Sequence, residues 1–247
     1  AGFFMVYISA SMPMAVAIPV VLIMTVALGL LIERAAYKPL RSAPRMSVMI
    51  SAIGVSYLLQ NLATYITGGL ARPYPEIPFL KGTFMLGALK IKIITVVTPL
   101  LTILLVIALV LFINHTKTGM AMRAVSRDFD TARLMGIKVN NIISVTFIIG
   151  SFLAGVGSIL YFSNYGQVSP TIGAMPGLKA FVAAVFGGIG SIPGAVLGAY
   201  IIGICESLIK ANDAIAIFSN AFTFALLILV LLFKPNGMFG EKLAEKV

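Results

Sequence analysis

The chain has no tryptophan, one cysteine, one histidine and few acidic residues, and these scarcities exclude several classes of protein. Its 247 residues include eight Asp and Glu, while Cys205 lies in an apolar run and His115 stands alone at the end of another. A single cysteine excludes a disulfide framework within the chain, so Cys205 is interpreted as a small packing residue. Scattered acids and an isolated histidine predict neither a metal site nor catalytic residues. We therefore expect a protein that performs no covalent chemistry and holds no cofactor of its own.

Charge is scarce as well, which excludes an ordinary soluble domain. Only 11% of the residues are charged and 60% are hydrophobic, whereas soluble domains carry about 25% charged residues. The apolar runs are long and continuous, unlike the alternating segments of a membrane barrel. The sequence therefore predicts an all-α polytopic membrane protein with about six to eight transmembrane or re-entrant helices. The net charge of +10 does not indicate nucleic acid, because the basic residues cluster at the ends of apolar runs, next to lipid headgroups.

The apolar runs give the order of the spans. Residues 2–11 are too short to cross a membrane, so we expect the second half of a span there and an amino-terminal truncation. The connection 33–45 holds four basic residues and is expected in the cytoplasm. Residues 71–92, rich in proline, are expected outside, with a short hairpin within 82–91. Full spans are expected at 14–32, 46–68, 93–116, 139–165 and 214–233.

One apolar segment, residues 178–205, is long for one helix and short for two. It is interrupted by glycines and a proline at 187–194, with Gly187, Gly188 and Gly190 in the break. If it forms two short crossings or a re-entrant hairpin, twelve of the 18 Lys and Arg residues lie inside and six outside, as the positive-inside rule favours. Such a break is either a tight turn between helices or part of a substrate path, because irregular backbone at membrane depth needs protein or water around it.

Polar and small residues inside the expected spans have two kinds of role. Ser56, Gln60 and Asn61 either form hydrogen bonds across helices or line a wet substrate path. Small residues allow close contact between helices, and this helix-packing role is predicted for Gly150, Ala154, Gly194 and Gly198.

Residues 117–138 form the one long polar segment of the chain, with seven charged residues. Asp128 is placed to cap a helix, and Gly136 is placed to end one with a positive φ. The pattern predicts a solvent-facing helix pair or bent helix between two spans. It is either a solvated cytoplasmic loop or a surface that touches a partner.

The sequence contains no obvious means of driving transport. All eight acidic residues fall outside the middles of the expected spans, and no phosphate-binding Walker loop is present. An active transporter of this kind would therefore receive its energy from a partner.

Several stretches resemble bacterial ABC-transporter permeases. RAVSRDFDTARLMGI, residues 123–137, is similar to their cytoplasmic coupling loop and ends in the Ala-x-x-x-Gly-Ile pattern of Ala132, Gly136 and Ile137. IERAAYKPLR, SAIGVSYLLQN, LKAFVAAVFGGIGSIPGAVLGAYIIGICESL and FALLILVLLFKPNGMFG resemble the high-affinity branched-chain amino acid permeases of that family, in the same order. The first helix of that family and its Asn-Phe-Ala-His-Gly motif are missing here, in line with the expected truncation.

The resemblance implies that residues 1–247 are a single permease domain of the bacterial inner membrane, with 117–138 as the coupling loop. It implies four kinds of protein partner: a second permease, two cytoplasmic ATP-binding subunits that hold ATP and Mg, and an extracytoplasmic binding protein delivering leucine, isoleucine or valine. Urea and short-amide permeases are similar, and a passive channel subunit is the other alternative. The coupling residues implied are Arg123, Ala124, Arg127, Asp128, Ala132, Arg133 and Gly136.

Overall fold

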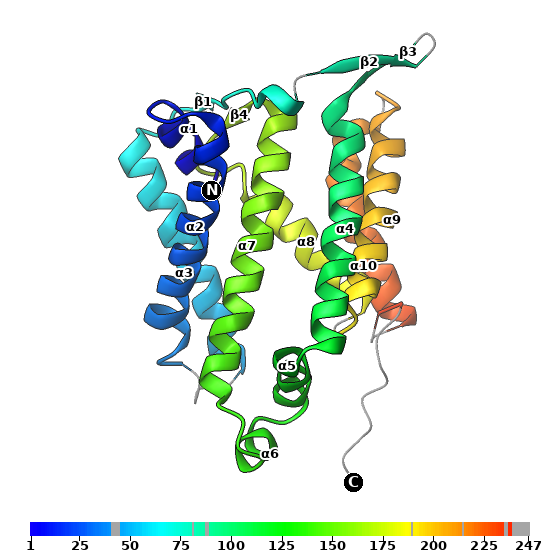
Figure 1. Ribbon diagram of the computed structural model, residues 1–247. Coiled ribbons are helices and arrows are strands. Elements are labelled where there is room, and N and C mark those ends of the chain that lie inside the picture. The colour runs from blue at the N-terminus through cyan, green and yellow to red at the C-terminus, as the bar shows by residue number, and fades with distance from the viewer. Residues whose placement is uncertain are drawn as a thin grey trace. The chain divides into compact units, whose positions relative to one another are not determined.

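The computed structural model consists mainly of α-helices (Figure 1) and describes residues 1–40, 45–80, 82–86, 89–188, 190–213, 215–234 and 237–238. The chain forms two compact units, Ala1–Thr171 and Ile172–Val247, and each is described by itself. The helices of the first unit are α1 (Gly2–Ser9), α2 (Met14–Ile32), α3 (Arg45–Thr67), α4 (Ile93–His115), α5 (Lys117–Arg127), α6 (Phe129–Leu134) and α7 (Val139–Tyr165). Those of the second unit are α8 (Ala174–Gly187), α9 (Ile192–Lys210) and α10 (Ser219–Phe233).

Among the described residues, five helices are long and apolar enough to cross a membrane. They cover Met14–Tyr37, Ile93–His115, Val139–Tyr165, Ile192–Lys210 and Ala216–Phe233. The first continues α2 through a π-helical turn, Glu33–Tyr37, and the last joins a 3₁₀ turn, Ala216–Phe218, to α10. The predicted bounds of α2 and α7 are confirmed. Ala214, where the last span was expected to begin, and residues 239–247 of the basic tail lie outside the described residues.

The helix α3 differs from the other long helices. It has 23 residues, but it is not among the five that are apolar enough to span, and its second half includes the amides Gln60 and Asn61. A helix at 46–68 is therefore confirmed, while its crossing of the membrane stays a prediction.

Short strands close one end of the first unit. The predicted hairpin is present as β2 (Thr83–Leu86) and β3 (Leu89–Lys92), which pair antiparallel with Thr83 opposite Lys92. The strands β1 (Arg72–Pro73) and β4 (Gln167–Val168) also pair antiparallel. In Figure 1 these strands lie at the end of α4 and α7 opposite to α5 and α6.

The helices α2 and α7 pack closely through small residues. A Cβ on Gly155 would lie 2.9 Å from Leu22, and one on Gly29 would collide with the hydroxyl of Ser151. Gly150 and Ala154, for which the sequence predicts a helix-packing role, do not take part in this contact, and their role stays a prediction. Both residues are exposed on α7, and a Cβ on Gly150 would meet no atom within 4 Å.

In the second unit, the segment expected at 178–205 is two helices joined by a break. α8 begins four residues earlier, at Ala174, and α9 continues to Lys210. With 14 residues, α8 is about 21 Å long and shorter than a hydrocarbon core. The segment is therefore one short helix and one helix of membrane length, and the choice between two crossings and a re-entrant hairpin stays a prediction.

Glycines bring α8 and α9 into backbone contact. A Cβ on Gly187 would collide with the carbonyl group of Gly194, and one on Gly198 would lie 2.7 Å from the carbonyl oxygen of Ala183. Apolar side chains complete the core, and Lys179 of α8 forms an ion pair of 2.6 Å with Glu206 of α9. Buried core residues of this unit are Val182, Ala183, Phe186 and Ile202.

We predict that Gly198→Leu lowers the stability of the protein by about 1–3 kcal/mol, because no space exists for a side chain between the two helices. The control is Gly203→Leu on the same helix, where a Cβ would meet no atom within 4 Å. Thermal unfolding of both variants in detergent measures the difference. Equal melting temperatures would show that the close contact of α8 and α9 is absent in the folded protein.

Candidate functional site

The segment α5–α6 leaves the end of α4 through a tight corner. Thr116 caps the amino-terminal end of α5, and its Oγ1 accepts a hydrogen bond of 3.0 Å from the backbone N–H of Gly119. A Cβ on Gly119 would collide with the backbone of Ile113 in α4. Only glycine fits this approach, so Thr116 and Gly119 together fix the direction in which α5 leaves the spanning helix.

A side-chain cap at the start of α6 and a glycine after its end define this short helix. The Oδ1 of Asp128 accepts hydrogen bonds from the N–H groups of Asp130, at 3.0 Å, and Thr131, at 3.3 Å. Gly136 has φ +81°, a conformation that favours glycine, and the chain turns there into α7. The predicted helix pair is present in the structure (Figure 1). Its cap at Asp128 and its end at Gly136 are confirmed as well.

The inner face of this segment attaches it to the spanning helix α7. Val125 of α5, Ala132 of α6 and Val139 of α7 are buried together, each 5% exposed or less. Ile137 and Ile142 pack against them. The structure therefore places the side chain of Ala132 inside its own chain, where it holds α6 in place instead of facing outward.

The outer face combines cationic and apolar side chains. Arg123, Ala124, Arg127 and Arg133 are exposed, as expected for a segment in water. Leu134 and Met135 are 87% and 78% exposed. A cluster of exposed apolar side chains on a polar segment is typical of a surface that contacts a partner. Phe129, half exposed, adds to it.

The polar residues expected along a substrate path lie in separate units. In α3, the Nε2 of Gln60 donates a hydrogen bond of 3.2 Å to the Oγ of Ser56, and the Nδ2 of Asn61 donates one of 2.8 Å to the carbonyl oxygen of Tyr57. Both of these bonds stay within one helix, and the choice between bonds across helices and a wet substrate path stays open for these residues.

The glycines of the break lie in the second unit. Gly187 and Gly188 are buried, and the chain after α10 covers them, since the N–H of Met238 donates a hydrogen bond of 2.9 Å to the carbonyl oxygen of Phe186. A Cβ on Gly237 would collide with the backbone of Gly188. Gly190 is exposed and has φ +99°. The break is thus a turn that is packed by backbone, and a role in a substrate path stays a prediction.

Comparison with known proteins identifies the family. The model of the family described as "Branched-chain amino acid transport system / permease component" matches residues 1–231, which cover most of both units. The chain belongs to this family.

Its relatives are membrane permeases. The permease is 41% identical over 231 residues to the high-affinity branched-chain amino acid transport system permease protein BraD of Pseudomonas aeruginosa, covering 92% of this chain and 74% of that protein. It is 41% identical over 226 residues to LivH of Escherichia coli, covering 90% and 72%. A probable branched-chain amino acid transport permease of Methanocaldococcus jannaschii is 30% identical over 239 residues, covering 90% and 73%. No solved structure matches.

These findings fix the class of the molecule. The chain is an all-α, multi-pass membrane permease component, and it is not an enzyme. Among the described residues, no group of three or more His, Cys, Asp or Glu could hold a metal ion. The residues that deserve functional tests are therefore those that contact other molecules.

Sequence reasoning missed two features of α5–α6 in the permease. The apolar residues Phe129, Leu134 and Met135 are exposed, although their type predicts burial. Gly119 makes the corner with α4, and sequence reasoning did not single it out although Thr116, a capping residue, lies three residues before it. The sequence signal for the exposed apolar residues was the pair Leu134 and Met135, which lies directly before the helix-ending Gly136.

We predict opposite outcomes for one substitution at two alanines of the permease. Ala132→Glu places a carboxyl group among Val125 and Val139 and should cost about 2 kcal/mol or more of local stability. Ala124→Glu, on the exposed face of α5, should change stability by no more than about 0.5 kcal/mol.

Limited tryptic cleavage at Arg127 and Arg133 measures this difference, because local opening of α5–α6 exposes both bonds. Faster cleavage is expected only in Ala132→Glu. Equal protection of the two variants would show that α6 is not anchored on α7.

Proposed function

We propose that the permease translocates leucine, isoleucine and valine across the bacterial cytoplasmic membrane as a subunit of an ABC importer. The observation that supports this most strongly is 41% identity over 92% of the chain to a permease protein that is named for high-affinity branched-chain amino acid transport. Similarity at this level, along almost the whole chain, favours a shared substrate class over a shared fold alone.

The energy for import enters through a partner. The chain has no Walker loop. Among the described residues one acid is buried, Glu33, which lies at the end of α2 and accepts a hydrogen bond of 3.2 Å from Ser144 of α7. A carboxylate in that position at a helix end is suited to hold two helices together. We infer that ATP and Mg bind to two cytoplasmic ATP-binding subunits that associate with this permease and with a second, similar permease.

The segment α5–α6 is the proposed contact with the ATP-binding subunit. Its outer face offers Phe129, Leu134 and Met135 for burial, together with the cations Arg123 and Arg133. Interfaces of this kind place apolar side chains at the centre and charged groups at the rim. The functional contact set is then these five residues with Ala124, Arg127 and Asp128, while Ala132 and Gly136 fix the shape of the segment.

The attachment of α5–α6 to the spanning helices α4 and α7 supports a coupling role. α5 begins one residue after α4 ends, and α7 begins shortly after α6, so both spanning helices lead directly into the contact. The corner at Gly119 and the cluster around Val125 make these joints stiff. A displacement of α6 by a closing ATP-binding subunit would therefore be passed to α4 and α7. An extracytoplasmic binding protein would deliver the amino acid at the opposite end.

The test uses the assembled transporter in proteoliposomes loaded with ATP. Leu134→Glu should leave folding unchanged, because this side chain is 87% exposed, but should lower leucine uptake on the order of tenfold or more, since it puts a charge into the contact. The control Leu134→Met keeps an apolar side chain of similar volume and should transport normally.

Isoleucine and valine should compete with labelled leucine for uptake, and urea should not. Full uptake by Leu134→Glu with the ATP-binding subunits still attached would contradict the coupling role. Competition by urea alone would contradict the substrate class.

A further inference from the structure

A cavity of about 320 Å³ lies in the first unit, where the loop after β1, the start of α4 and the last turn of α7 meet. Its volume is within the range of small-molecule sites. The residues of α4 and α7 that line it belong to the ends that lie opposite to α5–α6 (Figure 1), and the charge distribution places these ends outside the cell. An incoming substrate would meet this end of the permease first.

The hydroxyl group of Tyr74 is the unusual feature of this cavity. Tyr74 is only 5% exposed, and its hydroxyl is buried with no hydrogen-bond partner among the described residues. A buried hydroxyl without a partner is costly, and most such groups in native proteins are satisfied. Burial also raises the pKa of Tyr74, so the hydroxyl keeps its proton as a donor. The group is therefore ready to donate to an acceptor that enters the cavity.

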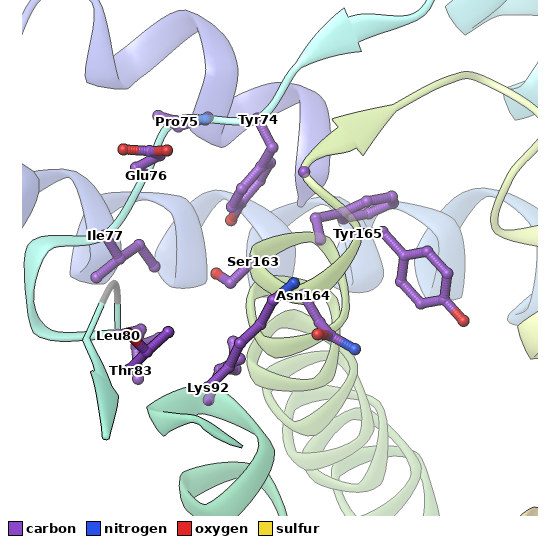
Figure 2. A pocket seen from close by; sticks show the side chains of 13 residues that line it. Tyr74, Pro75, Glu76, Ile77, Leu80, Thr83, Lys92, Ser163, Asn164 and Tyr165 are labelled. Carbon is purple, nitrogen blue, oxygen red and sulfur yellow. The ribbon is translucent and has the colours of Figure 1, made fainter. Parts of the chain in front are cut away.

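The position of Tyr74 is fixed by the backbone around it. β1 pairs with β4 immediately before Tyr74. The backbone N–H of Tyr74 donates a hydrogen bond of 2.9 Å to the carbonyl oxygen of Gly166 at the end of α7. Its ring packs on Phe162, with the ring centroids 5.8 Å apart. The hydroxyl points toward Ser163 in Figure 2. The backbone contacts fix where the side chain starts, and turning the ring toward water would break its contact with Phe162.

A cationic side chain lines the same cavity. Lys92, the last residue before α4, lines it and directs its ammonium group toward the last turn of α7 (Figure 2). Glu76 also lines the cavity and has an interaction partner of its own. A neutral O–H donor and an ammonium group together suit a carboxylate ligand.

The remaining lining suits the other parts of an aliphatic amino acid. The Oγ of Ser163 donates to the carbonyl oxygen of Ile159 at 2.7 Å and so keeps lone pairs for a cation. The C-terminal end of α7 adds partial negative charge at the same place. Ile77, Ile94 and Phe162 supply an apolar wall and are each buried.

We propose that this cavity is an entry site that binds a free aliphatic amino acid, with its carboxylate held by the Tyr74 hydroxyl and the Lys92 ammonium group. Its α-ammonium group lies near Ser163 and the end of α7, and its side chain contacts Ile77 and Ile94. The choice of an aliphatic amino acid rests on the proposed transport function. The site contacts the outer ends of α4 and α7, whose inner ends lead into α5 and α6, so occupancy of the cavity can influence the coupling segment.

The test measures binding of leucine, isovalerate and leucinamide to the assembled transporter in nanodiscs by titration calorimetry without ATP. Tyr74→Phe and Lys92→Met should each weaken leucine and isovalerate binding on the order of tenfold or more, because each removes a hydrogen bond to a charged group. Leucinamide, which lacks the carboxylate, should bind weakly to the wild type and to each variant. The control Tyr165→Phe removes a hydroxyl that points away from the cavity in Figure 2, and binding should stay within about twofold of wild type.

A stability measurement separates loss of a ligand contact from loss of folding. Tyr74→Phe removes an unsatisfied buried hydroxyl, so its melting temperature should equal or exceed that of wild type. Lys92 is exposed, so Lys92→Met should also fold normally and provides an independent result. Wild-type leucine affinity in both variants would overturn the proposal.

The outcomes also separate this proposal from the proposed function. Normal leucine uptake by wild type and all variants, with unchanged binding, would refute the entry site and leave the transport function in place. In the opposite outcome, the wild type takes up no leucine but binds a different amino acid, and Tyr74→Phe and Lys92→Met weaken that binding. This result would refute the substrate class and support the carboxylate site.

Discussion

The permease is organised by the requirement that backbone polar groups in a lipid bilayer find their hydrogen-bond partners within the protein. Long helices meet this requirement, and five described helices have the length and composition to cross. Charged side chains are consequently kept away from the middles of these five helices and lie toward their ends, where water is available. The two regions to which we assign function, the α5–α6 segment and the Tyr74 cavity, lie at opposite ends of α4 and α7 for this reason.

Close contact between helices is the second requirement, because lipid offers no hydrophobic force to press helices together. Glycine lets backbones approach at Gly155 between α2 and α7 and at Gly187 and Gly198 between α8 and α9. Gly119 serves the same purpose at the corner between α4 and α5. These contacts make each helix pair stiff, and stiffness is what a mechanical coupling of helix ends requires.

The sequence predicts elements that depend on local chemistry and fails for contacts that depend on the fold. The bounds of α2 and α7 follow from continuous apolar runs, and Asp128 and Gly136 were identified because capping needs only neighbouring residues. The contact of Gly155 with α2 was not predicted, because small residues occur on several faces of α7 and only the structure shows which face meets α2. Likewise, no local pattern indicates that the hydroxyl of Tyr74 is buried without a partner.

We propose that α6 touches the ATP-binding subunit of the assembled transporter. Photocrosslinking tests it most directly, with a photoreactive amino acid placed at Leu134, which is 87% exposed, and a second placed at Leu100 on α4 as a control for lipid-facing positions. We predict an adduct with the ATP-binding subunit from position 134 and none from position 100. An actively transporting complex that gives no such adduct from position 134 would contradict the account.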